Sequence, residues 1–139
     1  MMELLSGGDL FNYLEKRQFN LTESRAKTLA HQMATALYYL HSFGVAHRDL
    51  KPENILMSDN SDTAECKIVD FGLSKIIGPS QTSLDPFGTL SYVAPEVLLQ
   101  KPYGKEIDVW SLGVITYLMI ARVLPFDDEE EKEIARQTI

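Results

Sequence analysis

Apolar residues recur at helical spacing along one long stretch of the chain, from Thr22 to Ser42. Thr22 is a favourable N-cap residue, and Gly44 lies just past the end of the stretch, where glycine commonly terminates a helix. The pattern therefore predicts one long amphipathic helix. Its apolar face consists of Ala26, Leu29, Ala30, Met33, Leu37 and Leu40.

Shorter patterns predict elements on either side of this helix. Three apolar residues share one face between about residues 9 and 17, which indicates a short helix. Two short apolar runs, 54–57 and 66–69, flank a polar stretch and predict a small β-hairpin. Residues 72–91 are rich in Ser, Thr, Gly and Pro without clear periodicity, so they read as a long loop.

The last third of the chain reads as helical. A short helix is predicted after Pro95, a buried helix over about 107–121, and an acidic-started helix from about Asp127. The fold class predicted from the whole pattern is mainly α, with one small β-hairpin.

Composition fits one globular domain. The chain has 139 residues, 45% of them hydrophobic, and 13 basic against 20 acidic residues give a net charge of -7. Without a Lys/Arg stripe, this balance argues against nucleic acid or an anionic membrane as a partner. The most apolar window, 109–121, is shorter than the ~20 residues that a membrane-spanning helix needs. A lone Cys66 and the lack of a signal-peptide pattern predict an intracellular, cytoplasmic protein.

One motif places three chemically useful side chains directly after the long helix. In HRDLKPEN, at 47–54, a carboxylate, a cation and an amide stand within six positions, as Asp49, Lys51 and Asn54. DFG begins sixteen residues after Asn54, and the Glu that ends APE follows 26 residues after the Asp of DFG. In this order and spacing the motifs resemble the eukaryotic protein kinases, and the resemblance covers essentially the whole chain.

The resemblance implies phosphoryl transfer from ATP, with Mg²⁺ as cofactor. This reaction depends on positioning and on neutralising charge. Asp49 would accept or orient the proton of the substrate hydroxyl, and Lys51 would stabilise the transferring phosphoryl group. Asn54 and Asp70 would bind Mg²⁺, a hard cation that prefers oxygen ligands. Taken alone, Asp49 and Asn54 are also typical of turn hydrogen bonds, and Asp70 of a loop cap.

The run from Lys51 to Asn54 resembles the Ser/Thr version of the kinase catalytic loop, so the expected substrate is a protein Ser or Thr. In GTLSYVAPE, at 88–96, the resemblance implies that Thr89 hydrogen-bonds the catalytic Asp and Lys; the alternative is an ordinary loop into a helix. In DVWSLG, Asp108 would accept backbone N–H bonds from the catalytic loop; the alternative is a simple N-cap. The other substrate-binding residues implied are Pro86, Leu90 and Val93.

The resemblance also implies a nucleotide side of the site. Glu3 would lie in the hinge, at 1–8, whose backbone meets the adenine edge. His47 and Phe71 would belong to the regulatory spine. The residues expected to stack beneath the adenine are Leu10, Leu56, Ile115 and Met119. All six apolar or ring residues also read as ordinary core residues.

Two acidic positions suggest regulation and specificity. Many kinases bind a phosphorylated residue with the Arg of HRD, and Asp85 stands at that position here, so we expect Asp85 to pair with Arg48 and to lessen the need for phosphorylation. The alternative is a solvated turn residue. Asp9 and Glu53 match acidic positions that bind a basic residue three before the phosphoacceptor in related kinases, which predicts substrates with upstream Arg or Lys. For Asp9, the alternative is a carboxylate at a helix N-terminus.

FGLSKIIG and the C-terminal segment LPFDDEEEKEIARQTI most resemble the calcium/calmodulin-dependent and calcium-dependent kinase group. No calcium loop is expected within the chain, because an EF-hand needs Gly where Ala64 stands and Glu where Asp70 stands. A calcium-sensing domain would therefore lie outside this chain.

The sequence lacks the Gly-rich loop, the strand Lys and the helix Glu with which the family pattern begins. We therefore expect an incomplete kinase large lobe without the small lobe, running from the hinge to about the helix that the family labels G. It would contain the catalytic loop at 47–54, the activation segment at 70–96 and the central buried helix at 107–121. Three interpretations remain open: the core of an active Ser/Thr kinase, a non-catalytic lobe that binds substrates or partners, and a structural remnant.

Overall fold

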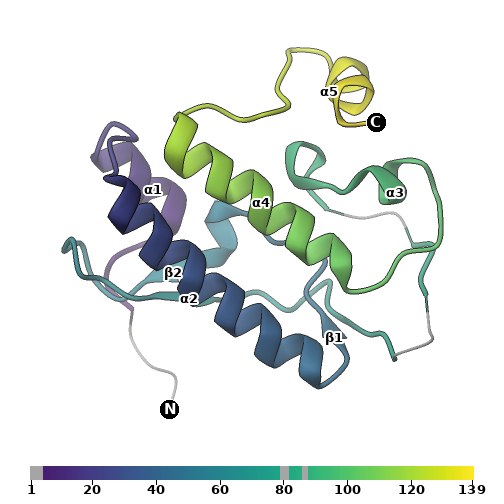
Figure 1. Ribbon diagram of the computed structural model, residues 1–139, viewed down its shortest axis with the longest axis horizontal. Helices are drawn as coiled ribbons and strands as arrows, with labels where there is room; N and C mark the ends of the chain where they lie inside the picture. The colour runs from purple at the N-terminus through teal and green to yellow at the C-terminus, as the bar shows by residue number, and fades with distance from the viewer. Residues whose placement is uncertain (1–4, 79–81, 86–87) are drawn as a thin grey trace.

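The computed structural model describes residues 5–78, 82–85 and 88–139, and it is mostly helical (Figure 1). The α-helices are α1 (Leu10–Lys16), α2 (Glu23–Ser42), α3 (Pro95–Leu98), α4 (Glu106–Ala121) and α5 (Glu131–Thr138). The 3-10 helices are η1 (Pro52–Asn54) and η2 (Leu90–Tyr92). The strands are β1 (Val45–Ala46), β2 (Ile55–Met57), β3 (Cys66–Ile68) and β4 (Lys75–Ile76). The predicted helical class with a small hairpin is confirmed.

Helices α2 and α4 lie side by side at the centre of the molecule and run antiparallel (Figure 1). At one end, His41 of α2 contacts Asp108 of α4. At the other end, Arg122, which follows α4, donates a hydrogen bond to Asn20, which precedes α2. Contacts at both ends therefore fix how the two helices align.

Two small antiparallel sheets lie beside this helix pair. Strands β2 and β3 form the predicted hairpin, with Leu56 opposite Lys67. Strands β1 and β4 form a second pair, with Ala46 opposite Lys75, which the sequence pattern did not predict. This second pair ties the loop after residue 72 to the segment that enters the HRDLKPEN motif.

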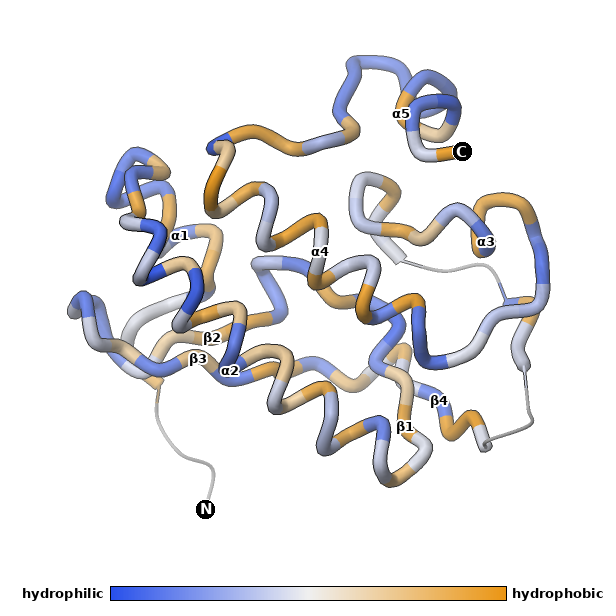
Figure 2. The backbone as a smooth tube through the Cα atoms, in the orientation of Figure 1, coloured by the Kyte–Doolittle hydropathy of each residue, from blue (hydrophilic) through white to orange (hydrophobic). Residues whose placement is uncertain are grey.

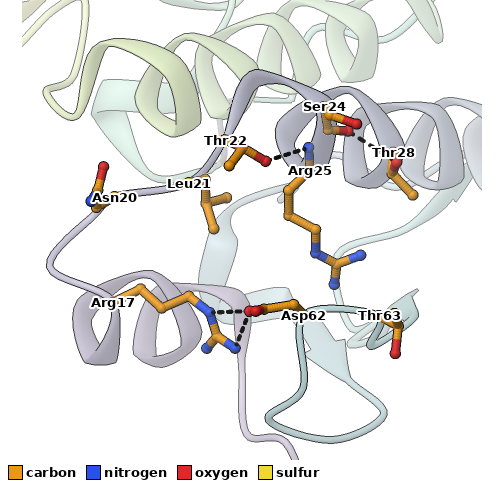
Figure 3. A pocket seen from close by; sticks show the side chains of 9 residues that line it. All are labelled: Arg17, Asn20, Leu21, Thr22, Ser24, Arg25, Thr28, Asp62 and Thr63. Atoms are coloured by element: carbon orange, nitrogen blue, oxygen red, sulfur yellow. Dashed lines mark hydrogen bonds and ion pairs between the residues drawn. The ribbon is translucent and has the colours of Figure 1, made fainter.

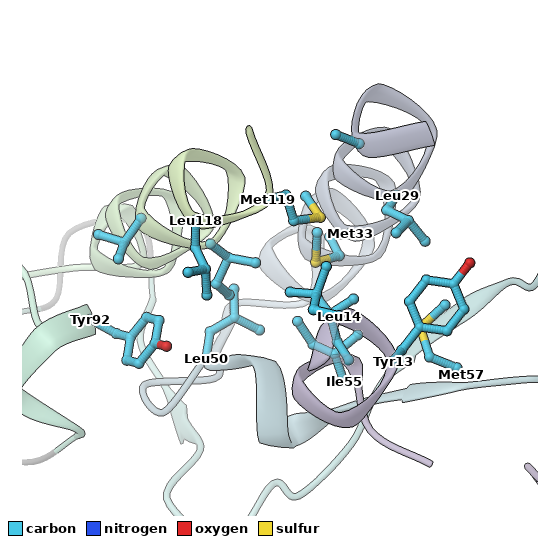
Figure 4. Packing of buried hydrophobic residues seen from close by; sticks show 14 of the residues in the cluster. Tyr13, Leu14, Leu29, Met33, Leu50, Ile55, Met57, Tyr92, Leu118 and Met119 are labelled. Atoms are coloured by element: carbon cyan, nitrogen blue, oxygen red, sulfur yellow. The ribbon is translucent and has the colours of Figure 1, made fainter. Parts of the chain in front are cut away.

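The main hydrophobic core forms where α1, α2 and α4 meet the hairpin, and a second, smaller cluster lies beneath α3. Figure 4 shows side chains of the main core converging from all four elements. The fully buried ones include Tyr13, Leu14, Leu29, Met33, Ile55 and Met57. Burying each such side chain stabilises the fold by about 1.5–3 kcal/mol. The loop that follows β1 therefore packs against this core.

Local chemistry sets the helix ends. The Thr22 hydroxyl accepts a hydrogen bond from the Arg25 amide, as expected of the N-cap of α2. Helix α5 begins at Glu131, four residues later than the predicted start near Asp127. The Asp128 carboxylate accepts a bond from the Glu130 amide, and this local turn competes with helix. The predicted start of this helix was wrong for that reason.

Hydropathy along the backbone separates the buried helices from the acidic C-terminal part. Figure 2 shows hydrophobic colour recurring along α4, whereas the turn into α5 and most of α5 are hydrophilic. Within the described ranges, no helix combines the length and the apolar character that crossing a membrane requires.

Candidate active site

A loop between β1 and β2, residues 47–54, carries three of the predicted catalytic residues. Its backbone is anchored by the Asp108 carboxylate of α4, which is 1% exposed. Oxygen Oδ2 accepts from the His47 amide at 2.8 Å, and Oδ1 accepts from the Arg48 amide at 2.9 Å. The predicted bonds from this loop to Asp108 are confirmed. The N-cap alternative is wrong, because Asp108 lies inside α4, whose N-cap is Lys105.

A third donor completes the anchor. His41 Nε2 lies 2.8 Å from Asp108 Oδ2, and because a carboxylate only accepts, this ring nitrogen donates. In return, Lys105 Nζ donates to the backbone oxygen of His41 at 2.7 Å. The end of α2 and the start of α4 are therefore joined by two bonds of opposite direction, which hold Asp108 in place beneath the loop.

Asp49, Lys51 and Thr89 form one hydrogen-bonded group. Lys51 Nζ donates to Thr89 Oγ1 at 2.9 Å and lies 3.5 Å from Asp49 Oδ2. Thr89 Oγ1 lies 3.4 Å from Asp49 Oδ1, to which it donates. Thr89 comes from the segment before η2, far along the chain from the loop. The fold thus brings a carboxylate, an ammonium and a hydroxyl together at the surface.

Asn54 lies beside the same carboxylate and is 7% exposed. Its Nδ2 donates to the Asp49 backbone oxygen at 2.9 Å and to Asp49 Oδ2 at 3.2 Å. Because these bonds fix the amide nitrogen, the oxygen Oδ1 is the atom that remains to bind a ligand. An amide oxygen held in this way suits a hard cation such as Mg²⁺.

Asp70 directly follows Val69, whose backbone amide and backbone oxygen both form hydrogen bonds to the 47–54 loop. The Val69 amide donates to the Asn54 backbone oxygen, and the Val69 oxygen accepts from His47 Nε2, both at 2.9 Å. Asp70 itself has a positive φ of 60°, and its Oδ1 accepts from the Gly72 amide. The second carboxylate oxygen remains as a further hard ligand. Within the described ranges, no three His, Cys, Asp or Glu side chains group as a metal site.

Phe71 packs against the loop through His47. The two ring centres are 5.2 Å apart in an edge-to-face arrangement. His47 is fully buried, whereas Phe71 is 44% exposed. Phe71 is therefore a contact of the loop in this structure and not a buried core residue.

Arg48 joins the loop to the segment after DFG. Its Nε donates to the Leu73 backbone oxygen at 2.6 Å, and its Nη1 lies 3.4 Å from Asp85 Oδ2. Asp85 also accepts from Lys75 Nζ at 2.7 Å and from the Ser83 hydroxyl at 3.0 Å. Hydrogen bonds from Lys75 and Ser83 hold the pKa of the Asp85 carboxyl below its usual range. The structure thus brings together the predicted pair, Arg48 and Asp85, and adds Lys75.

Tyr103 also contacts this charged group and bonds to both Asp85 and Arg48. Its hydroxyl donates to the Asp85 backbone oxygen at 2.9 Å and accepts from Arg48 Nη1 at 3.2 Å. The backbones of Ser83 and Tyr103 exchange two hydrogen bonds as well. The roles of Lys75, Ser83 and Tyr103 were not predicted. Lys75 belongs to the segment FGLSKIIG, but no local pattern links it to Ser83 or to Tyr103.

The predicted substrate-binding residues occupy different environments. Asp9 is the N-cap of α1, and Asn12 occupies both its carboxylate oxygens, so its structural alternative is borne out. Glu53 is exposed, Leu90 is half-buried, and Val93 is buried in the second cluster. Pro86 lies outside the described residues.

On the nucleotide side, Leu56 is half-buried in β2, and Glu3 lies outside the described residues. The other three residues expected beneath the adenine are within the main core, as their structural alternative predicts. These are Leu10, Ile115 and Met119.

A mostly helical fold that gathers a carboxylate, an amine and an amide on one anchored loop has the groups that phosphoryl transfer requires. The protein kinase domain family matches residues 1–139, and the chain belongs to this family. Its parent family is that of the serine/threonine protein kinases.

Three relatives illustrate the similarity. Calcium/calmodulin-dependent protein kinase type 1B of Homo sapiens is 46% identical over 138 residues, which cover 99% of this chain and 40% of that protein. Myosin light chain kinase A of Dictyostelium discoideum is 44% identical over 137 residues, covering 99% of this chain and 46% of that protein. Probable serine/threonine-protein kinase pXi of the same organism is 45% identical over 128 residues, covering 92% and 18%. The chain therefore spans less than half the length of these relatives.

Proposed function

We propose that this chain is part of the large lobe of a serine/threonine kinase and supplies the residues with which the parent enzyme transfers the γ-phosphoryl group of ATP to a protein hydroxyl. The observation that carries the proposal is the group formed by Asp49, Lys51 and Thr89, with Asn54 beside it. A carboxylate that already accepts a hydroxyl donor is suited to accept a substrate hydroxyl in the same way.

In the proposed reaction, the substrate oxygen forms a bond to the γ-phosphorus while the bond from that phosphorus to the β–γ bridging oxygen breaks. Asp49 takes or orients the hydroxyl proton, and ADP leaves. Lys51 places positive charge beside Asp49 and the entering oxygen, and Thr89 fixes the ammonium group. Mg²⁺, held by Asn54 and Asp70, would neutralise charge on the phosphates.

The test is transfer of labelled phosphate from Mg·ATP to a Ser peptide that carries an Arg upstream, measured in the parent enzyme. Asp49→Asn keeps the shape but removes the proton acceptor, so kcat should fall by about 10²–10⁴-fold. Glu129→Gln removes an exposed carboxylate and should leave kcat unchanged. Transfer that survives Asp49→Asn would refute the proposal. The same assay on this chain alone separates an active lobe from a lobe that only binds partners.

We propose further that the substrate carries a basic residue upstream of the phosphoacceptor. Support comes from acidic groups around Tyr92. Burial is the main cause that raises the pKa of this tyrosine, and the negative charges of Glu53 and Asp127 raise it further. Each of these two carboxylates therefore lies within electrostatic range of the Tyr92 hydroxyl. Profiling a peptide library with the parent enzyme tests the idea, and indifference to Arg three residues before the acceptor would overturn it. Glu53→Gln should weaken the preference, whereas Glu129→Gln should not.

A third part of the proposal concerns regulation. Asp85 occupies Arg48 and Lys75 with a fixed charge of about -1, where a phosphate would supply roughly -1.5 to -2. The parent enzyme should therefore retain activity without phosphorylation of this segment, and Asp85→Ala should lower it. Unchanged activity of Asp85→Ala would contradict this role. Regulation by calcium would act through segments outside this chain and is tested by adding Ca²⁺ and calmodulin to the parent enzyme.

A further inference from the structure

A cavity of about 560 Å³ lies apart from the candidate active site, between the connection from α1 to α2, the first turns of α2 and the tip of the β2–β3 hairpin (Figure 3). None of the catalytic residues named above lines it. Its size falls in the range of roughly 300–1,000 Å³ that ligand sites occupy. Two arginines from different elements, Arg17 and Arg25, reach it.

Both guanidinium groups are arranged around one buried aromatic ring. Tyr13 is fully buried, and its hydroxyl donates to the Ser61 backbone oxygen at 2.8 Å and accepts from Arg25 Nε at 3.3 Å. The Arg17 guanidinium lies 3.7 Å from the centre of the Tyr13 ring, and that of Arg25 lies 5.6 Å from it. Because packing already orders these long side chains, little further entropy is lost when they bind a ligand.

Each arginine keeps unused donors. Arg25 Nη2 donates a hydrogen bond to the Ala64 backbone oxygen, and Arg17 Nη2 donates to the Asn60 backbone oxygen and to the Asp62 carboxylate. Among the described residues, neither Nη1 nitrogen has a hydrogen-bond partner. Both nitrogens are therefore available to an acceptor.

The chain itself shows which acceptor fits. Asp62 Oδ1 lies 3.3 Å from Arg17 Nε and 3.0 Å from Arg17 Nη2, although the Asp62 side chain is 90% exposed. The lining has two arginines and one aspartate, a formal charge of +1, in a chain of net charge -7. A carboxylate is thus already held at one side of the cavity, and the second arginine has no carboxylate of its own there.

We propose that this cavity binds a Glu or Asp side chain of an acidic peptide segment in a partner protein. The carboxylate would accept from Arg25 Nη1, next to the Ser24 hydroxyl, and Leu21 would contact an apolar neighbour of the acidic residue. Guanidinium groups suit carboxylates because their planar donors match the two oxygens. The site serves docking of a partner and does not depend on phosphoryl transfer.

The test is fluorescence anisotropy with a labelled peptide that contains two adjacent glutamates flanked by leucines, titrated with this chain in the absence of ATP. The same peptide with glutamines in place of the glutamates is the ligand control. The glutamate peptide should bind at least about tenfold more tightly, because charge-assisted hydrogen bonds are lost with glutamine. Raising the salt concentration should weaken its binding. Equal binding of the two peptides would overturn the proposal.

Two variants test whether the peptide binds in this cavity. Ser24→Glu puts a negative charge into the lining at an exposed helical position and should weaken binding about fivefold or more. Lys27→Gln is the matched control, since it makes the same change in net charge on the same exposed helix, outside the lining. It should change binding by less than about twofold. Equal weakening by both variants would show that only net charge matters and would refute the site.

Arg25→Gln removes the free donor and should weaken binding about tenfold. Because this variant also loses bonds to Tyr13 and Ala64, its fold is checked by thermal unfolding, and Ser24→Glu gives the answer that does not depend on those bonds. In a ¹⁵N spectrum, the glutamate peptide should shift amides of the cavity lining, in 20–28 and 62–63. Shifts confined to other parts of the chain would equally contradict the proposal.

Discussion

Replacing Asp108 by alanine tests how the candidate active site is held together. The carboxylate is 1% exposed and accepts from two backbone amides, those of His47 and Arg48, and from His41 Nε2. Asp108→Ala leaves both amides without their acceptor in a buried place. Each unpaired buried donor costs about 1–3 kcal/mol. We therefore expect the free energy of unfolding to fall by about 3–5 kcal/mol, a large part of the 5–15 kcal/mol typical of a domain.

The assay is urea unfolding followed by the fluorescence of Trp110, the single tryptophan of the chain. Trp110 stacks on Phe126 with ring centres 5.8 Å apart, so its emission should change when α4 separates from the following segment. Glu129→Ala is the control, because it removes an exposed carboxylate, and its effect should stay within about 0.5 kcal/mol. Asp108→Asn keeps one acceptor oxygen and should cost less than Asp108→Ala.

Amide hydrogen exchange separates a local effect from a global one. In Asp108→Ala, the His47 and Arg48 amides should exchange faster than the loss of global stability explains, because their acceptor has gone. A cost below about 1 kcal/mol for Asp108→Ala, or unchanged exchange at these two amides, would refute the conclusion that this carboxylate anchors the loop.

Three further predictions concern separate features. Gly88→Ala should destabilise the turn before Thr89 by about 1–3 kcal/mol in urea unfolding, because Gly88 has a φ of 95° and an added Cβ would lie 2.8 Å from Val93 Cγ2; an unchanged midpoint would contradict this. Burial raises the pKa of the Cys66 thiol to about 11 from 9.0, so alkylation by iodoacetamide near pH ~8 should be roughly a hundredfold slower in the folded chain than in urea, and equal rates would refute it. The pKa of the Asp85 carboxyl is lowered below 3.8, so its contribution to stability is present above that pH and is lost as pH falls through the lower folded value. Asp85→Asn should therefore unfold less steeply with acid than the wild type, which circular dichroism against pH can measure.

Those parts of the fold that depend on neighbouring residues could be predicted from the sequence. The cap at Thr22 and the apolar face of α2 are local features, and the predicted helix agrees with the observed one within a residue at its start. Strands β1 and β4 have two residues each and pair across about thirty residues, so no local period reveals them. The start of α5 was missed because the Asp128 turn competes with a pattern that favours helix from Asp127.

The candidate site divides in the same way. Asp49, Lys51 and Asn54 could be predicted as site residues, because their short spacing within one motif was enough to place them on the same loop. His41 and Lys105 were missed, since their roles appear only when α2 and α4 lie antiparallel and bring the ends of the two helices into contact. A sequence pattern identifies groups that act on a substrate more readily than groups that hold those residues in position.

Arg48 shows why the supporting groups matter for the proposed regulation. Its φ of 72° is in the left-handed region, a conformation that costs a residue other than glycine about 1–3 kcal/mol. The backbone amide is held by Asp108 from α4, while the side chain is held by Leu73 and Asp85 from the segment after DFG. Both sets of contacts act on the residue that directly precedes Asp49. We therefore expect a change of charge at Asp85 to affect the proposed catalytic carboxylate through Arg48 alone, because the backbone conformation of Arg48 depends on these contacts.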